Sequence, residues 1–343
     1  MQKKIYEFSS KKVSYFFDAD FSHLKKLADK DHPLVITDEN LVRHHPEKFS
    51  GWNKVVIRPG EEFKVQSTVD SIISTLVQAK ADRQTLLIGV GGGVVTDITG
   101  YVASTYMRGI RFGFVPSSLL AMVDAAIGGK NGIDVGVYKN LVGTIRQPEF
   151  LLFDSSLLKS LPRNEWENGF AEIIKHACIK DEKLFRELEK NRIETYQKDP
   201  SALSKLIRTN AMIKSEVVRK DEYELGDRKL LNFGHTIGHA IENVYNLHHG
   251  QAISIGMVAA CILSEQFIGF KETARVIALL TRYGLPTLAE FNAKKAFEVL
   301  KMDKKRERQA MKYVLLNKIG QGVVKPIPLD RLEKLIHSIV RAR

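Results

Sequence analysis

The chain has 343 residues, 44% of them hydrophobic, and a formal net charge of +12 at pH 7. This length suits two domains with sizeable cores, and the presence of only Cys178 and Cys261 excludes a disulfide framework and suits a reducing compartment. Residues 1–7 lack the apolar core of a signal peptide, and the apolar stretch near 253–263 is too short to span a bilayer, so we expect a cytoplasmic protein.

The excess of basic residues suits three kinds of partner: nucleic acid, an acidic membrane surface or an anionic small substrate. Most of these residues lie in stretches such as 180–190, where charges of both signs are typical of a solvated helix face. One local cluster, 301–308, has no aromatic residues for base stacking. We interpret it as either an exposed loop or a cationic flap over a bound anion.

In the first half of the chain, short β-branched runs alternate with helical stretches, as is typical of a parallel sheet with crossover helices. The predicted strands are residues 34–37, 54–57, 85–89, 112–115 and 150–153, and a helix is predicted over 65–81. Beyond a hinge at 154–162 the pattern predicts helices over 164–179, 200–220, 234–244 and 251–270, a hairpin of 311–316 with 322–326, and a last helix over 330–340.

These elements predict two domains. Residues 1–158 are expected to form an α/β nucleotide-binding domain with a parallel-rich, Rossmann-like sheet. Residues 159–343 are expected to form an all-α C-terminal metal-binding domain, interrupted only by the small hairpin.

A glycine-rich turn, residues 91–93, follows the predicted strand 85–89 and leads into a helix that reaches Tyr106. Such glycines permit positive φ and leave backbone amides uncovered, so that a diphosphate can bind at the helix N-terminus. The pattern is not the G-x-G-x-x-G of the standard dinucleotide fingerprint, and a tight turn without a ligand is the alternative. Upstream, residues 59–64 carry charges suited to ribose or phosphate, although such charges are also ordinary on surfaces.

The segment 115–140 is dense in glycine, acid, lysine and amide. This mixture disfavours a packed core and favours binding of a polyhydroxylated anion. Within it, Lys130 and Asn140 are candidates to hold a phosphate, the first by charge and the second by amide donation.

A histidine motif, residues 232–242, predicts a divalent metal site together with Glu172 and His249. His235 and His239 are four residues apart and so share one helix face, and zinc is commonly held by three such nitrogen or oxygen donors. A pair with this spacing also occurs on purely structural helices. The glycines at 234 and 238 favour the functional alternative, because two glycines within one helical turn imply that something closely approaches this backbone.

The order and spacing of these segments resemble the 3-dehydroquinate synthase family of the sugar phosphate cyclase superfamily, from about Asp38 to Lys305. The resemblance implies an N-terminal nucleotide domain, a helical metal domain and an active site between them. It also implies an enzyme of the shikimate pathway that uses NAD and Zn²⁺ or Co²⁺, acts on an anionic sugar phosphate, and forms a homodimer without nucleic-acid or membrane partners.

Position by position, the resemblance implies metal ligands at Glu172, His235 and His249, and moves His239 to a proton-handling role near the leaving phosphate. For the cofactor it implies Asp38, Asn40, Glu61, Lys64, Gly92, Gly93, Val94, Asp97, Ser117, Ser118, Lys130, Lys139 and Ser160. For catalysis it implies Asp124, Lys130, Lys175, Glu224 and His239. For substrate binding it implies Lys130, Asn140, Lys214, Arg228, Asn232, His239, Lys304 and Lys305, with Arg108 reaching across from a second subunit.

The reaction implied by the resemblance converts 3-deoxy-D-arabino-heptulosonate 7-phosphate into 3-dehydroquinate and phosphate. It proceeds by transient oxidation with NAD⁺, β-elimination of phosphate, reduction, ring opening and intramolecular aldol closure, so no net redox change occurs. Lys214 and Arg228 are expected to pair with the substrate carboxylate.

Four positions depart from the usual family pattern: Met122, Asn131, Tyr138 and Gln251. Gln251 replaces a glutamate that usually follows His-Gly, which we expect to remove a carboxylate from the surroundings of the metal. These changes raise the question of the substrate. Because Lys214 and Arg228 are both present, a carboxylate-bearing substrate is favoured over the sedoheptulose 7-phosphate or glucose 6-phosphate of related cyclases.

Two other functions fit parts of this pattern. A metal-dependent polyol dehydrogenase pairs a similar nucleotide domain with a helical metal domain, and net NADH accumulation would distinguish it. A basic nucleic-acid-binding or regulatory protein on the same fold would instead show salt-dependent duplex binding and no bound metal.

Overall fold

The structure is a computed structural model that describes residues 1–28, 32–136, 138–242, 245, 247–288, 292, 294, 297–298, 306–307 and 310–341. The chain forms two compact units. The first comprises Met1–Glu165 and Asp199–Tyr223, and the second comprises Trp166–Lys198 and Glu224–Arg343.

Within the described part of the first unit, seven strands form one sheet in the order β1-β2-β9-β6-β5-β3-β4. All neighbouring pairs are parallel except the edge pair β1 and β2, so the prediction of a parallel-rich sheet is confirmed. The strands are β1 Gln2–Glu7, β2 Lys12–Phe17, β3 Pro33–Asp38, β4 Lys54–Ile57, β5 Leu86–Gly91, β6 Arg111–Pro116 and β9 Phe150–Leu152.

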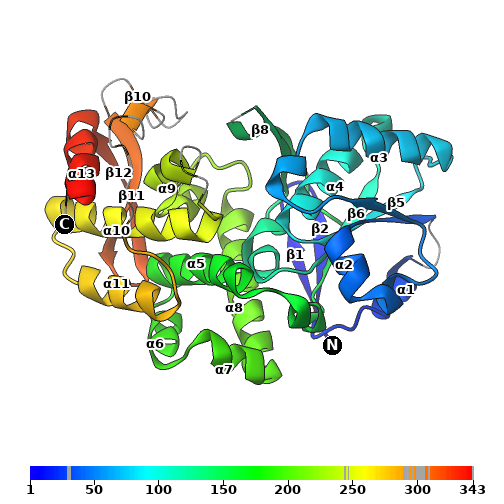
Figure 1. Cartoon of the computed structure of the whole chain (residues 1–343), viewed down its shortest axis with the longest axis horizontal. Helices are drawn as coiled ribbons and strands as arrows, with labels where there is room; N and C mark the ends of the chain where they lie inside the picture. Colours follow the sequence, from blue (N-terminus) through cyan, green and yellow to red (C-terminus); the bar gives the residue numbers. More distant parts are fainter. Residues whose placement is uncertain are drawn as a thin grey trace. The chain divides into compact units, whose positions relative to one another are not determined.

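Helices cover both faces of this sheet, and Figure 1 draws α3 and α4 above the strands and α1 and α2 below them. The central strand β5 is buried along its whole length, as expected of a strand packed on both faces. Val35, Ile88 and Val115 join one continuous core with Phe21 and Leu41. The helices of this unit are α1 His23–Ala28, α2 Glu39–His44, α3 Gln66–Gln78, α4 Gly93–Thr105 and α8 Pro200–Lys220.

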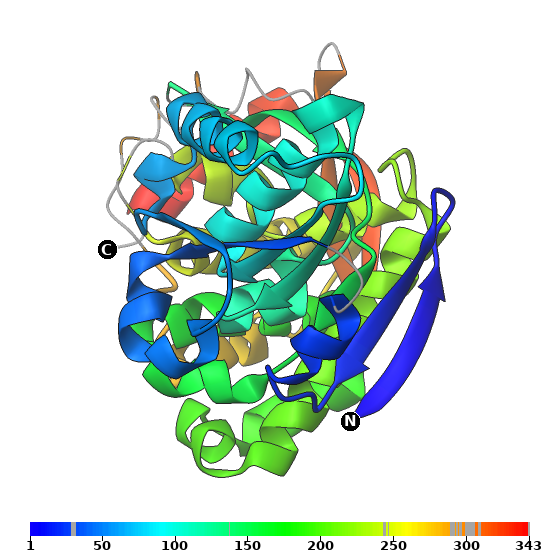
Figure 2. The same ribbon diagram turned by 90° about the vertical axis from the view of Figure 1, so that its right-hand side faces the viewer.

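Two features of the first unit were not predicted. The edge hairpin of β1 and β2, seen side by side in Figure 2, begins with a polar strand that gives no burial signal. A second antiparallel pair, β7 Lys130–Val135 and β8 Tyr138–Ile145, occupies much of the segment expected to be a binding loop. That segment also enters the core, because Met122 and Val123 of the π-helix Ala121–Ala125 are fully buried, contrary to the expectation of an unpacked stretch.

The compact units differ from the division predicted at residue 158, because α8 belongs to the first unit. Asp199 caps the start of α8 by accepting hydrogen bonds from the backbone N–H groups of Ser201 and Ala202. Farther along the helix, Ser215 is hydrogen-bonded to the Tyr15 hydroxyl of β2 at 3.0 Å. The Ser215 contact attaches α8 to the sheet, although the helix follows helices of the other unit in the chain.

The second unit is mainly helical, as predicted, and it also includes a three-stranded antiparallel sheet that contains the predicted hairpin. Its elements are α5 Arg163–Lys180, α6 Glu182–Lys190, α7 Ile193–Lys198, α9 His235–Glu242, α10 His249–Ile268, α11 Thr273–Arg282, β10 Arg306–Glu307, β11 Ala310–Lys318, β12 Gln321–Pro328 and α13 Leu329–Arg341. By length and composition α10 alone among the described helices is apolar enough to cross a membrane, but most of it is buried, as expected of a core helix.

Candidate metal and nucleotide sites

The metal-site residues come from three helices that approach one another at glycines. A Cβ added at Gly256 of α10 would lie 1.9 Å from the carbonyl oxygen of Gly234, and one added at Gly238 of α9 would lie 2.8 Å from Ile253. The close approach expected at the two glycines of the histidine motif is therefore made by the backbone of α10.

Helix α10 meets α5 in the same way. A Cβ added at Gly250 would lie 2.7 Å from Cα of Asn168, whose side-chain oxygen accepts a hydrogen bond from the Gly250 N–H at 3.0 Å. Since His249 precedes Gly250 and Glu172 lies one turn beyond Asn168, this contact brings the histidine to the carboxylate.

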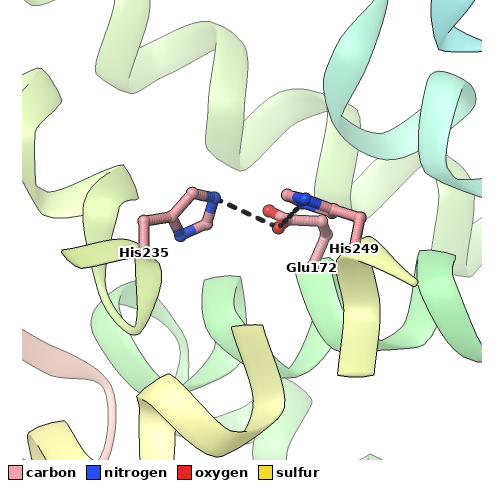
Figure 3. Close-up of side chains that lie close together, drawn as sticks. All are labelled: Glu172, His235 and His249. Atoms are coloured by element: carbon pink, nitrogen blue, oxygen red, sulfur yellow. Dashed lines mark hydrogen bonds and ion pairs between the residues drawn. The ribbon is translucent and has the colours of Figure 1, made fainter. Parts of the chain in front are cut away.

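Glu172, His235 and His249 converge, with one donor atom from each lying within 4.8 Å of the others. The Oε1 atom of Glu172 is 3.4 Å from Nε2 of His235 and 3.2 Å from Nε2 of His249 (Figure 3). Donors bonded to one tetrahedral zinc ion at about 2.1 Å lie about 3.4 Å from one another. The distances from Glu172 to the two histidines therefore match those between ligands of a single zinc ion.

Both histidines are oriented by a partner at their other ring nitrogen. Nδ1 of His235 faces the carbonyl oxygen of Phe233 at 3.1 Å, and Nδ1 of His249 faces Oε2 of Glu242 at 3.4 Å. A hydrogen on each Nδ1 leaves the Nε2 lone pairs directed at Glu172, which is the tautomer that metal binding requires.

Burial and charge act differently on the two rings. Burial lowers the pKa of His235 well below its usual value, so this imidazole is neutral and able to donate its lone pair. Burial also opposes protonation of His249, but hydrogen bonds with Glu172 and Glu242 raise the pKa of His249 to about 10. A cation that enters this site therefore displaces a proton held between His249 and the carboxylates.

Other predicted site residues of the second unit surround this cluster or lie near it in sequence. Lys175, 1% exposed, forms an ion pair with Oε2 of Glu172. His239 is exposed, and its ring centroid lies 5.1 Å from that of His235. Asn232 donates a hydrogen bond to Glu224 at 2.6 Å, and Arg228 is buried to 2% exposure.

In the first unit, five of the predicted cofactor residues lie at the carboxyl ends of parallel strands. Asp38 ends β3, Gly92 and Gly93 follow β5, and Ser117 and Ser118 follow β6. These ends meet at one edge of the sheet because Thr37 pairs with Val90 and Gly91 pairs with Pro116. Ligands of open α/β sheets bind at such edges.

The glycines of the turn after β5 do not use the positive φ that the sequence analysis gave as one reason for them. None of Gly91, Gly92 and Gly93 has a positive φ, and Gly92 is extended at φ −71 and ψ −170. Gly91 is required because an added Cβ would lie 2.4 Å from Cβ of Val95. At Gly92 the nearest atom to an added Cβ is Oγ of Ser118 at 3.5 Å, so the start of α4 keeps an uncrowded backbone.

Lys64 connects two other predicted cofactor residues. Its ammonium group lies 2.9 Å from Asp97 and 3.3 Å from Glu61, and the residue is 4% exposed. Burial acts against the charge, but Asp97 and Glu61 raise the pKa of Lys64 above its usual value, so the ammonium stays protonated. Val94 lies beside these residues in the first turn of α4.

Three of the residues predicted to bind the cofactor form hydrogen bonds within the protein. Asp38 caps α2 by accepting from the N–H of Leu41 at 3.0 Å, and burial raises the pKa of its carboxyl group. Asn40 accepts a hydrogen bond from Arg43, and Ser160 pairs with His45 at 2.9 Å. Neither of these last two bonds reaches another predicted cofactor residue.

Asp124 and Lys214 are brought together within the first unit. The Lys214 ammonium lies 2.8 Å from both the carboxylate and the backbone carbonyl oxygen of Asp124. Lys130 follows Gly128 and Gly129, which have φ values of 105 and 73. The amide of Asn131 fixes this turn, because it donates to the carbonyl oxygens of Gly129 at 2.8 Å and Arg146 at 3.0 Å.

The remaining predicted site residues are exposed or lie outside the described residues. Lys139 and Asn140 are exposed on β8, where Asn140 has φ 52 and its N–H donates to Asp134 at 2.7 Å. Arg108, with φ 65, precedes a turn at Gly109. Lys304 and Lys305 lie outside the described residues.

The structure differs from the sequence-based expectation about which polar side chains surround the histidines of the proposed metal site. Gln251 caps α10. Its side-chain oxygen accepts a hydrogen bond from the His248 N–H at 3.2 Å and completes a capping box at the start of that helix. The carboxylate beside His249 is that of Glu242, which sequence reasoning gave no role although it ends the histidine motif.

Comparison with known proteins agrees with this architecture. Residues 54–168 match the family described as 3-dehydroquinate synthase N-terminal, and residues 169–306 match 3-dehydroquinate synthase C-terminal. The 3-dehydroquinate synthase of Pyrococcus abyssi is 42% identical over 289 residues, covering 83% of this chain and 85% of that protein. The one from Methylacidiphilum infernorum is 44% identical over 294 residues, covering 83% and 80%.

Among solved structures, 2-epi-5-epi-valiolone synthase from Streptomyces hygroscopicus, with NAD⁺ and Zn²⁺ bound, is similar along the whole length of both chains, with a TM-score of 0.86 and 25% identity. The family matches together extend through both units, and the relatives cover more than two thirds of the chain. The chain belongs to the 3-dehydroquinate synthase family.

Proposed function

We propose that the protein is a 3-dehydroquinate synthase, a carbon–oxygen lyase that converts 3-deoxy-D-arabino-heptulosonate 7-phosphate into 3-dehydroquinate and phosphate. Family membership supports this reaction. The observation that carries the proposal is the convergence of Glu172, His235 and His249 at the spacing of zinc ligands.

Glu172, His235 and His249 are the proposed ligands of a divalent ion, Zn²⁺ or Co²⁺. When bound, this ion polarises the hydroxyl group that is oxidised, and NAD⁺ serves as the transient hydride acceptor. Lys175, buried beside Glu172, offsets part of the carboxylate charge. His239 is exposed next to the cluster and is proposed to handle the proton of the leaving phosphate.

Arg228 and Lys214 are the proposed partners of the substrate carboxylate. A guanidinium matches a carboxylate in bidentate geometry, whereas an ammonium acts as a point charge. The contact with Asp124 holds the Lys214 side chain in one direction before substrate arrives. Asn232, oriented by Glu224, and Lys130 with Asn140 are proposed to bind the phosphate, together with Lys304 and Lys305.

The proposed cofactor is NAD, bound at the edge of the sheet where β3, β5 and β6 end. The start of α4 offers backbone N–H groups to the diphosphate, and Lys64, fixed by Asp97 and Glu61, offers a buried cation. Asp38, Ser117 and Ser118 supply further polar groups at the same edge. We also propose a cytoplasmic homodimer in which Arg108 contributes to the partner's site, to be tested by sedimentation.

Phosphate release tests the proposed reaction. Purified protein with NAD⁺ and Zn²⁺ is expected to release phosphate from the heptulosonate phosphate without accumulating NADH. Turnover of sedoheptulose 7-phosphate but not of the heptulosonate would assign the protein to another cyclase. Stoichiometric NADH formation from a simple polyol would instead show a dehydrogenase.

A further inference from the structure

Glu242 is a buried carboxylate of the second unit that the proposed reaction leaves without a role. It is the last residue of α9 and is 7% exposed, and its Oε2 lies 3.4 Å from Nδ1 of His249. The other nitrogen of the same ring, Nε2, lies 3.2 Å from Glu172. One imidazole thus lies between two carboxylates on opposite edges of its ring.

The two carboxylates have different relations to the proposed ion. Glu172 faces the Nε2 atoms of both His235 and His249 and so has the position of a ligand. Glu242 faces Nδ1 of His249, on the edge of the ring away from Glu172. A carboxylate in that position accepts the Nδ1 hydrogen, selects the tautomer with a lone pair on Nε2, and makes the imidazole a stronger donor.

The matching contact at His235 is made by a backbone carbonyl, that of Phe233 at 3.1 Å. His235 is the first residue of α9, and its orienting partner is a backbone carbonyl that no side-chain change can remove. His249 is likewise the first residue of α10, but its orienting partner is the side chain of Glu242. Its orientation therefore depends more on a side-chain partner than that of His235 does.

We propose that Glu242 is a positioning residue that sets the affinity of the site for its divalent ion by orienting His249. This inference rests on the proposed role of Glu172, His235 and His249 as ligands. In the proposed reaction, Glu242 contacts neither the substrate nor the cofactor. Loss of such a partner typically weakens metal binding about 10- to 100-fold.

One competing arrangement involves the same residues. Donor atoms of His239, Glu242 and His249 also lie within 4.8 Å of one another, so Glu242 is spatially able to serve as a ligand of a second cation. The two arrangements differ in stoichiometry. A positioning residue leaves one ion per chain, whereas a ligand of a second site adds another that disappears with Glu242.

The experiment measures Zn²⁺ affinity and stoichiometry by competition with a chromophoric chelator, at one pH and without NAD or substrate, on the full chain. The variants are Glu242→Gln, which keeps the shape and an acceptor oxygen, and Glu242→Ala. The matched control is Gln251→Glu, which places a carboxylate where the family usually has one. Thermal unfolding of each metal-free variant shows whether it folds.

We expect one ion per chain throughout, with affinity lowered about 10-fold in Glu242→Gln and up to about 100-fold in Glu242→Ala. Gln251→Glu is expected to stay within about twofold of the parent, because residue 251 serves the helix cap. Saturating Zn²⁺ is expected to restore most of the kcat of Glu242→Gln, which a loss of general stability would not allow.

Unchanged affinity in both Glu242 variants, or a second ion lost with Glu242, would overturn the inference. Glu172→Gln separates this outcome from failure of the proposed function. If the parent binds one ion and Glu172→Gln binds none while the Glu242 variants bind normally, only the inference about Glu242 fails. If the parent binds no ion, the proposed metal site itself fails.

Discussion

Two glycines, Gly256 of the helical unit and Gly92 of the unit with the seven-stranded sheet, have opposite surroundings. Gly256 and Gly238 allow α9 and α10 to approach until backbone atoms touch, and this contact helps bring His235 and His249 to Glu172. Gly92 has no such neighbour, since an added Cβ would make only ordinary contact at 3.5 Å. Gly256 therefore serves close packing, whereas Gly92 leaves open the backbone to which we propose that the diphosphate binds, a difference that the residue type alone does not reveal.

Replacing Glu172 by Gln is expected to have the largest effect. The amide keeps the shape but loses the charge that holds the cation, and a metal's Lewis-acid contribution of several kcal/mol corresponds to a fall of about 1,000-fold in phosphate release. Titration with NAD⁺ should give a dissociation constant close to that of the parent, because the nucleotide edge lies in the other unit. Unaffected turnover would show that the ligand assignment is wrong.

Gly256→Ala tests the role of glycine in the helical unit. An alanine inside a helix normally stabilises it by up to about 1 kcal/mol relative to glycine. Here the added methyl group meets the Gly234 carbonyl oxygen, so we expect the free energy of unfolding to fall by about 3 kcal/mol or more. Chemical denaturation measures it, and a variant as stable as the parent would refute the close-contact explanation.

Gly92→Ala makes the corresponding change in the nucleotide unit. Its φ of −71 suits alanine and its surroundings have room, so the free energy of unfolding should change by less than about 1 kcal/mol. The methyl group covers backbone that a diphosphate would approach, and we expect NAD⁺ affinity to fall about 10-fold or more. Calorimetric titration with NAD⁺ checks this, and normal affinity would place the diphosphate elsewhere.

The smallest expected effect concerns Glu222, a buried carboxylate that follows α8 and is hydrogen-bonded to the turn between β1 and β2. Burial alone would raise the pKa of Glu222, but hydrogen bonds from Ser9, Gln147 and Ser10 lower it below its usual value. Its contribution to stability is therefore complete above the unfolded-chain pKa and is lost as the pH falls through the lower folded value.

Glu222→Gln should consequently lower the free energy of unfolding by about 1–2 kcal/mol at pH 7, and the difference from the parent should shrink in acid. Glu216→Gln is the control, because Glu216 pairs with Arg219 on the exposed face of α8 and should cost less than about 1 kcal/mol. A pH-independent difference at Glu222 would exclude its ionisation as the cause.

Much of the fold was predictable because buried strands and amphipathic helices leave periodic patterns. The strands β3, β4, β5, β6 and β9 and the helices α5, α8, α9 and α10 lie where the sequence predicts them, with small shifts at their ends. The exposed strand β8 was missed because all but one of its residues are exposed, so it lacks the alternation that marks a strand. Assignment of α8 to the sheet unit depends on tertiary contacts that local sequence does not encode.

The place of the candidate metal site was predictable. Residue type and spacing indicated a site around Glu172, His235, His239 and His249, and the family resemblance selected all but His239 as the proposed ligands, whose donor atoms lie within 4.8 Å of one another. Partners that orient those ligands were not predictable, because they depend on rotamers and on how α9 approaches α10. Gln251 was expected near the metal and instead caps a helix, whereas Glu242 stands beside His249.

The central claim is that one divalent ion is shared by a carboxylate and two imidazoles from three helices. Crystals grown with Zn²⁺ and measured at the zinc absorption edge test it most directly. The account predicts one anomalous peak about 2.1 Å from the Glu172 carboxylate and from Nε2 of His235 and His249. A peak bound by other residues, or no peak in crystals that contain active enzyme, would contradict it.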